Sequence, residues 1–136
     1  MVGGVIVSHG QLGKELIATA EMIVGKIPNI TSVSIDVTSD VETSREQIRQ
    51  AIKSVNNGAG VVIFTDMFGG TPSNISLSFL DEANIEVITG VNLAMLLQLS
   101  TSGKAEPFQQ IVQSLKQRGQ ENIHIASEFL KQRGKK

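Results

Sequence analysis

Apolar residues along the chain follow two periods in turn, one typical of strands and one typical of helices. The β-branched run of residues 5–7 stops just before His9 and Gly10, which predicts a buried strand that ends in a sharp turn. Apolar residues then recur at helical spacing over residues 12–24, and Gly25 ends this pattern. The chain therefore opens with a strand followed by an amphipathic helix.

The next stretch repeats this order with a different balance of polar residues. Alternation over residues 30–37 predicts a strand with one more exposed face, nearer the edge of a sheet. Ser39 and Glu42 have the spacing of a capping box, and the apolar stripe behind them predicts a helix over residues 41–55. Residues 60–66 are apolar up to a final carboxylate, as expected for a strand buried on both faces.

The second half of the chain continues the alternation. Thr71 is expected to cap a helix that has Pro72 at its first position, and Asn92 to cap a later one. The helix that begins at Thr71 is expected to continue to Asp81, and a strand follows over residues 85–89. Two helices are predicted over residues 93–99 and 108–119, with a polar loop between them over residues 100–105. A short strand is predicted over residues 122–126. We predict an α/β fold: a mostly parallel, doubly wound sheet with helices on both faces, and room for an antiparallel C-terminal edge strand.

Composition limits the protein to one small domain. With 136 residues, of which 40% are hydrophobic, the chain is long enough for one core and too short for two domains. We place this domain in residues 1–130 and interpret residues 131–136 as a basic C-terminal tail. The 12 basic and 13 acidic residues give a net charge of −1, which argues against a nucleic-acid partner.

Cysteine and long apolar runs are both absent from the sequence. Without cysteine, a disulfide scaffold, a thiolate nucleophile and a cysteine metal site are excluded, and a reducing compartment fits. No apolar run approaches the roughly 20 residues of a membrane span, and residues 1–4 lead into the first strand without the features of a signal peptide. We expect a cytoplasmic protein and predict neither a metal nor a cofactor.

Two polar residues stand at the ends of the two most apolar strands. His9 follows the first strand and Asp66 ends the third. In open α/β sheets, ligands gather at the carboxyl ends of the strands, at the point where the direction of winding reverses. If the first and third helices lie on opposite faces, the first and third strands flank that point. His9 and Asp66 are then expected to meet there.

The chemistry that suits this pair is phosphoryl transfer. A histidine is largely uncharged near neutral pH and keeps one ring nitrogen free to attack, so His9 is the candidate nucleophile. A carboxylate bonded to the other nitrogen fixes the tautomer and stabilises the ring after attack, which makes Asp66 the second candidate catalytic residue. An anionic group also needs donors. The candidate phosphate-binding residues, through backbone amides at two helix starts, are Gly10, Gly69, Gly70 and Thr71.

Each of these residues also has an ordinary structural interpretation. A single histidine at the end of a strand is more often a hydrogen-bonding partner than a nucleophile. Asp66 before a glycine-rich stretch is equally typical of a turn former or a helix cap, and Gly69 and Gly70 of a tight turn. Phe68 fits the core as well as an exposed rim for a partner protein. His124, in the short final strand, is assigned no role.

Three other function classes share parts of this pattern. A two-component receiver needs an acidic pair after its first strand to hold Mg²⁺, and this chain has none there. A non-catalytic nucleotide- or phosphate-binding module of the same fold stays open as the alternative, although neither glycine-rich phosphate-loop motif is present. A serine hydrolase would need Gly-x-Ser-x-Gly, which is absent, and the neighbours Ser8 and His9 point to opposite sides of a strand.

Three motifs in order carry a family resemblance. They are VIVSHG at residues 5–10, FTDMFGGTPSN at residues 64–74 and TGVNLAML at residues 89–96. In sequence and spacing they resemble the mannose-family IIA domain of the bacterial phosphoenolpyruvate-dependent sugar phosphotransferase system. The resemblance extends over the chain to about Gly119.

The resemblance implies a free-standing phosphotransferase that works through a phosphohistidine. His9 would be phosphorylated on Nε2 by the histidine-containing phosphocarrier protein and would pass the group to a IIB component, which serves the membrane IIC and IID components in sugar uptake. Asp66 would bond the other ring nitrogen, and Thr71 would lie at the phosphate pocket. Family members are homodimers that exchange a C-terminal strand, which here corresponds to residues 123–126.

Overall fold

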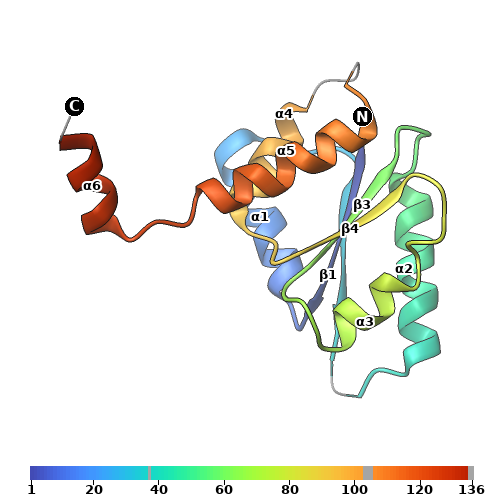
Figure 1. Cartoon of the computed structure of the whole chain (residues 1–136). Helices are drawn as coiled ribbons and strands as arrows, with labels where there is room; N and C mark the ends of the chain where they lie inside the picture. Colours follow the sequence, from blue (N-terminus) through green and yellow to red (C-terminus); the bar gives the residue numbers. More distant parts are fainter. Residues whose placement is uncertain (37, 103–105, 135–136) are drawn as a thin grey trace.

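The computed structural model describes residues 1–36, 38–102 and 106–134, and Figure 1 shows how strands and helices alternate along them. The strands are β1 (Gly3–His9), β2 (Ile30–Ile35), β3 (Val61–Thr65) and β4 (Ile85–Thr89). The helices are α1 (Leu12–Val24), α2 (Val41–Val55), α3 (Thr71–Leu77), α4 (Leu93–Thr101), α5 (Phe108–Glu121) and α6 (Ala126–Gly134).

The four strands form one parallel sheet in the order β2-β1-β3-β4. Val7 of β1 lies between Val33 of β2 and Thr65 of β3, so the carboxyl ends of these strands share one edge of the sheet. β1 and β3 occupy the centre, which explains their continuously apolar sequences, whereas β2 lies at the edge as predicted. The predicted fold class is confirmed.

Helices cover both faces of the sheet. Figure 1 shows α1, α4 and α5 on one side, and α2 and α3 on the other. Side chains of β1 alternate between the two cores: Ile6 packs with Phe64 under the first layer, and Val5 and Val7 pack with Ile75 under the second. Because α1 and α3 lie on opposite faces, the direction of winding reverses between β1 and β3.

The predicted capping box at the start of α2 is wrong by one residue. Asp40 is the N-cap, and its carboxylate accepts a hydrogen bond from the N–H of Thr43 at 3.0 Å. Ser39 is engaged in the preceding turn instead, where its hydroxyl accepts from the N–H of Asp36 and donates to the Asp36 carboxylate. Asp40 therefore supplies the cap, while Ser39 is already hydrogen-bonded in the turn.

The start of α3 also differs from prediction. Gly70, and not Thr71, is the N-cap, and its carbonyl accepts the N–H of Asn74 at 3.0 Å. A φ of +85° at Gly70 turns the chain into the helix, a conformation that glycine adopts without steric cost. The other predicted cap is confirmed, because Asn92 accepts from the N–H of Met95 at 3.2 Å.

Helix ends shift by a few residues. α3 ends at Leu77 rather than at Asp81, because the chain continues in turns closed by bonds such as Phe79 N–H to Ser76 O. α4 extends to Thr101, into the stretch predicted as a loop. Three predicted segments end outside the described residues: the loop at residues 103–105, the second strand at Val37 and the tail at residues 135–136. No helix in the described ranges is both long enough and apolar enough to cross a membrane.

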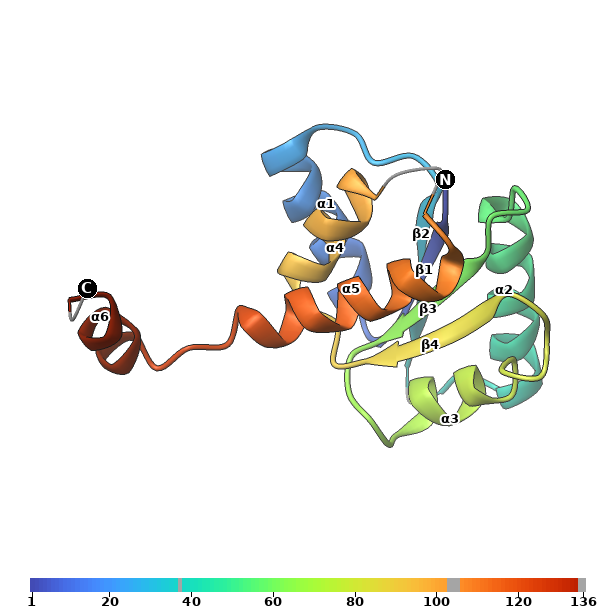
Figure 2. The ribbon, with the colours of Figure 1, turned by 45° about the horizontal axis from the view of Figure 1, so that its top comes forward.

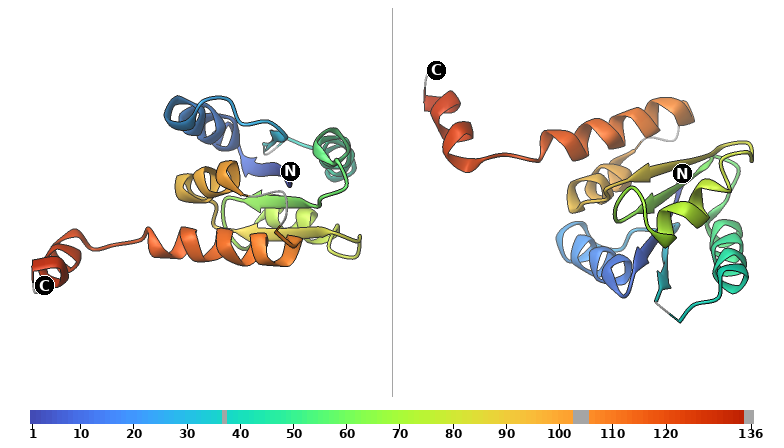
Figure 3. Two further views of the ribbon diagram at one scale, coloured as in Figure 1. Left: turned by 90° about the horizontal axis from the view of Figure 1, so that it is seen from above. Right: turned by 60° about the horizontal axis from the view of Figure 1, so that its bottom comes forward.

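The C-terminal part departs most from prediction. Residues 122–125 form no strand, and α6 begins at Ala126, so the strand predicted over 122–126 is wrong for the chain by itself. A strand requires a neighbouring edge to pair with, and this segment leads away from the sheet. Figures 2 and 3 show α6 standing off the body at the end of it, and none of its residues is buried. We call residues 122–134 the C-terminal arm.

Candidate functional site at the carboxyl ends of the central strands

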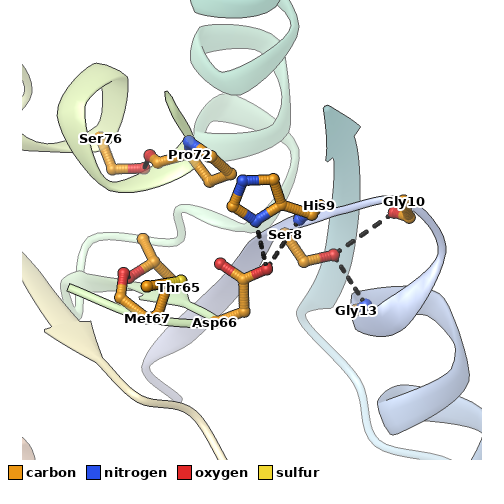
Figure 4. A network of polar contacts seen from close by, with 9 residues as sticks. All are labelled: Ser8, His9, Gly10, Gly13, Thr65, Asp66, Met67, Pro72 and Ser76. Atoms are coloured by element: carbon orange, nitrogen blue, oxygen red, sulfur yellow. Dashed lines mark hydrogen bonds and ion pairs between the residues drawn. The ribbon is translucent and has the colours of Figure 1, made fainter. Parts of the chain in front are cut away.

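His9 and Asp66 meet where β1 and β3 end side by side, as the sequence predicted. Nδ1 of the His9 ring lies 2.8 Å from Oδ2 of Asp66, and the same oxygen accepts the backbone N–H of His9 at 2.8 Å (Figure 4). Two bonds to one oxygen fix both the position and the rotation of the imidazole. The residues are 57 positions apart in the chain, so the parallel pairing of β1 with β3 brings them together.

The Asp66 carboxylate sits in an environment that keeps it ionised. Its side chain is 11% exposed, whereas that of His9 is 52% exposed. Burial raises the pKa of Asp66, but the backbone N–H of His9, the ring hydrogen bond and the ring's charge together outweigh it and hold the pKa below its ordinary value. An ionised carboxylate only accepts, so in the neutral imidazole Nδ1 carries the ring proton and Nε2 has the free lone pair.

The turn after His9 is held by the hydroxyl of Ser8. This oxygen accepts the N–H of Gly13 at 2.9 Å and donates to the carbonyl of Gly10 at 3.4 Å (Figure 4). Ser8 is fully buried, because neighbouring strand residues alternate in direction, and it therefore takes no part with His9 as a nucleophile pair. Sequence reasoning missed its role in the turn, and no signal short of the folded turn would have shown it.

The backbone amide of Gly10 has a different role from the one expected. Its φ of +55° allows the turn, but its N–H already donates to the carbonyl of Ile35 at 3.0 Å. That amide is therefore not free to hold a phosphate in this arrangement. The prediction of Gly10 as a phosphate-binding amide is corrected to a role in the shape of the loop.

The glycine-rich loop after β3 lies against the free side of the imidazole. A Cβ atom at Gly70 would be 3.2 Å from Cε1 and 3.5 Å from Nε2 of His9. Gly69 and Gly70 both have positive φ values, of +87° and +85°. Within the described part of the chain, the N–H groups of Gly69, Gly70 and Thr71 have no protein acceptor, and Thr71 is exposed. Of the predicted loop residues, Gly70 thus lies beside Nε2, and Gly69 and Thr71 are its neighbours in the chain.

Two buried polar atoms near this loop also lack partners among the described residues. They are Oδ1 of Asp66 and the hydroxyl of Ser73. Phe68 is 75% exposed, which decides against a place in the core. His124 lies in the C-terminal arm, where its ring stacks on Phe129 at 4.4 Å between centroids, and it is not part of the site.

The imidazole of the site is exposed to solvent over 52% of its side chain. A hollow of about 840 Å³ lies between β2 and α2, and one of about 540 Å³ lies beside β4, but neither is lined by His9, Asp66 or the glycine-rich loop. Small-molecule sites are normally concave and bury most of their ligand. An exposed nucleophilic nitrogen with an oriented ring is instead suited to exchange a group with another macromolecule.

The comparison with known families agrees with this geometry. Residues 3–126 match the EIIA-man family model, described as PTS system fructose IIA component. The chain belongs to the EIIA-man family. It is a phosphoryl-carrier IIA component of a phosphotransferase system for sugar uptake, and the non-catalytic binding module considered from the sequence is not favoured.

Named relatives and a solved structure are similar to this IIA component over most of its length. It is 28% identical over 131 residues to the PTS system fructose-specific EIIA component of Bacillus subtilis (strain 168), covering 96% of this chain and 90% of that one. It is 30% identical over 121 residues to the mannose-specific EIIAB component of Escherichia coli (strain K12), but spans only 38% of that protein. The phosphotransferase system component EIIA of Streptococcus agalactiae has the same fold, with a TM-score of 0.84, 23% identity and coverage of 94% and 99% of the two chains.

Proposed function

We propose that this IIA component carries its phosphoryl group on Nε2 of His9. The observation that carries the proposal is the pair of 2.8 Å bonds by which Asp66 Oδ2 holds the ring nitrogen and the backbone N–H of His9. They leave Nε2 as the free nitrogen, on a side chain that is 52% exposed. A nucleophile that must meet a second protein needs this accessibility.

The transfer step requires no cofactor. The Nε2 lone pair of His9 forms a bond to the phosphorus of a phosphohistidine on the donor protein. The donor's P–N bond breaks, and its electron pair returns to the donor's imidazole nitrogen. The proton stays on Nδ1 of His9, so the phosphorylated ring is positively charged beside the Asp66 carboxylate, which stabilises it. Reversal of the same step toward an acceptor histidine releases the group.

The phosphoryl oxygens are expected to be held by the glycine-rich loop. Gly70 lies on the Nε2 side of the ring, and the N–H groups of Gly69, Gly70 and Thr71 have no acceptor among the described residues. Successive backbone N–H groups in a turn can form an anion-binding concavity. The absence of a Cβ at Gly70 leaves room for the group beside Nε2.

Membership of the family implies that the protein interacts with a phosphocarrier protein and a IIB component. We propose that the donor is the histidine-containing phosphocarrier protein, that the acceptor is a histidine of the IIB component, and that the IIC and IID components take part only indirectly. A cytoplasmic location belongs to the same proposal. So does the division of the chain into a domain over residues 1–130 and a basic tail from Lys131.

We also propose that the protein is a homodimer that exchanges its C-terminal arm. β4 is an edge strand with a groove of about 540 Å³ beside it, lined by residues 86–90 and by Ile123 at the start of the arm. Ile123 and Ile125 are 75% and 65% exposed, which is costly for side chains without a covering partner. Pairing of the arm with β4 of a second copy would cover them. A monomer mass by light scattering at micromolar concentration would contradict this.

Phosphoryl transfer from labelled phosphocarrier protein tests the main proposal. One acid-labile, base-stable phosphate per chain is expected, and His9→Ala should abolish it. The chain offers a matched control in its second histidine, and His124→Ala should be labelled like the wild type. Label that persists in His9→Ala, or that maps to another residue, would refute the assignment.

A further inference from the structure

The hollow of about 840 Å³ lies at the β2 edge of the sheet, between that strand and α2. Residues 32–34 of β2 form one side of it. One face of α2 forms the other side, because the lining residues recur at helical spacing: Glu42, Thr43, Glu46, Gln47, Gln50 and Ala51. We call this hollow the β2 groove.

The backbone of β2 is only half paired along the groove. The N–H of Gly10 donates to the carbonyl of Ile35 at 3.0 Å, and over the length of β2 the odd-numbered residues bond β1. Successive residues of a strand direct their N–H and C=O groups to opposite sides. Those of Ser32 and Ser34 therefore point away from β1, where no other strand of the described chain pairs with them.

β2 lacks the features that normally protect an edge strand. Natural edges are blocked by charged residues, a proline, a bulge or a covering segment. Residues 30–35 contain neither a charged residue nor a proline, and their continuous pairing with β1 leaves no bulge. The other edge strand, β4, has Glu86 within it. The β2 edge is therefore open to a further strand.

Side chains of α2 specify the charge of such a strand. Two of them are the carboxylates of Glu42 and Glu46, and none of the described residues that line the groove is a Lys or an Arg. Each carboxylate pairs with an arginine three residues further along α2. Exposed pairs of this kind are weak, and Arg49, the partner of Glu46, lies over the Phe79 ring at 5.3 Å, outside the groove lining. The groove thus presents acidic groups to an incoming segment.

The other face of an added strand would meet small and apolar groups. A Cβ at Gly13 would be 3.2 Å from Cβ of Ser32, so this serine faces α1. Ile30 faces the same way and packs, partly buried, against the core under α1. Side chains alternate along a strand, so those of an added strand would point in turn toward α2 and toward the α1 side. Basic and apolar residues in alternation suit the two faces.

We propose that the β2 groove binds an extended segment of a partner protein as an additional strand of the sheet, with Lys or Arg at every second position toward Glu42 and Glu46. In such strand addition, main-chain hydrogen bonds supply affinity and alternate side chains supply specificity. Neither His9 nor Asp66 lines the groove. The proposal is therefore independent of the proposed function, and a bound segment should leave phosphoryl transfer to His9 unchanged.

Amide hydrogen exchange, measured by NMR with a heptapeptide of alternating valine and lysine as the probe, tests this proposal. At saturating peptide, the amides of Ser32 and Ser34 should exchange at least about tenfold more slowly. The amide of Val33, which already bonds β1, should not change. Glutamate in place of lysine, or methylation of every peptide nitrogen, should abolish the protection. The proposal is wrong if the lysine peptide gives no protection, or if the glutamate peptide protects equally.

Charge variants locate the binding site on the protein. Glu42→Gln/Glu46→Gln should weaken binding of the lysine peptide about fivefold, because two exposed charge contacts are lost. Asp81→Asn/Glu82→Gln is the matched control, since it removes two exposed carboxylates from the turns before β4, at the opposite edge. It should bind as wild type. Equal weakening in both variants would mean that net charge, and not the groove, attracts the peptide.

Two further results would overturn the proposal. Protection of Ser32 and Ser34 that grows with protein concentration in the absence of peptide would show that a second copy covers the edge. A lysine peptide that slows labelling of His9 by the phosphocarrier protein would show that it binds at the phosphoryl site. Wild-type protein that the carrier fails to label without peptide would instead refute the proposed function and leave the role of the β2 groove standing.

Discussion

Two strands of the sheet are each followed by an aspartate. One carboxylate forms hydrogen bonds with its neighbours in the chain, and the other with a residue far away in the chain. Asp36 follows β2 and Asp66 follows β3, and the pKa of each lies below its ordinary value. Among the described residues, the Asp36 carboxylate bonds only within its own turn, where Thr38 donates both its hydroxyl, at 2.6 Å, and its N–H, at 2.8 Å. Asp66 bonds His9, which lies 57 positions away in the chain. The same residue in the same local setting becomes a turn former at the edge of the sheet and part of a site at its centre.

Replacing each aspartate by asparagine should give the largest difference between the two regions. Asp66→Asn keeps the shape of the side chain but removes the charge that stabilises a phosphorylated His9 ring. We expect the rate of phosphoryl transfer to fall by about two orders of magnitude. Asp36→Asn should leave it unchanged. Rapid-quench labelling of both variants measures the contrast, and equal rates would reduce Asp66 to a turn residue.

Two glycines in loops that follow strands allow a test of the space beside the His9 ring. Gly70 and Gly90 both have positive φ, of +85° and +80°, but a Cβ at Gly70 would face the His9 ring whereas one at Gly90 would meet open space. Alanine at either position should cost about 1–2 kcal/mol of unfolding free energy, because L-residues are strained there. Only Gly70→Ala should also slow transfer, by about tenfold, equivalent to about 1.4 kcal/mol.

Urea unfolding of the two variants and an assay of transfer would separate these effects. A Gly90→Ala variant that transfers as slowly as Gly70→Ala would show that strain in the loops, and not space beside Nε2, limits the reaction.

Lowering the pH should reduce the free energy of unfolding more through protonation of Asp66 than through protonation of Asp36. A carboxyl with a lowered pKa contributes stability above its unfolded pKa, and the contribution is lost as the pH falls through the folded value. The difference in unfolding free energy between wild type and Asp66→Asn should therefore shrink as the pH falls through the ordinary aspartate pKa of about 3.9 and on through the lower folded value. For fully exposed Asp36 the corresponding difference should be smaller, because solvent screens its interactions. Denaturant unfolding over this pH range measures both, and equal slopes would contradict the comparison.

The smallest effect is expected from Thr38→Ala. This change removes the hydroxyl that is the main cause of the lowered pKa of Asp36, so that pKa should rise toward its ordinary value. NMR titration of the Asp36 carboxyl measures the shift. Labelling of His9 should proceed at the wild-type rate, since no hydrogen bond joins the described residues of this turn to the ring. A slower rate would show that the turn after β2 supports the site.

Local pattern was sufficient for most of the fold. The apolar periods predicted α1, α2 and β3 within one residue of their observed ends and located β1, which extends two residues further than its predicted apolar run on each side. Burial of one face of a helix or strand produces an apolar residue at regular intervals along the sequence, and this period identifies the element. Caps were predicted less well, since neighbouring polar side chains such as Ser39 and Asp40 compete for the same amides and only the folded turn decides which one caps.

By itself, the sequence determined the fold class, the two polar residues at the strand ends and the family motifs around them. Tertiary structure decided which polar residues act together. Strand order placed Asp66 beside His9 and left Asp36 in its turn. The carbonyl of Ile35 at the end of β2 engaged the Gly10 amide, and loop geometry exposed Phe68. Residues 122–126 could form a strand only by pairing with the edge strand of a sheet, and the pattern within these residues does not show whether such an edge lies beside them. The reason is the same throughout: periodicity reports which side of an element is buried, whereas contacts between distant residues depend on how the elements are ordered.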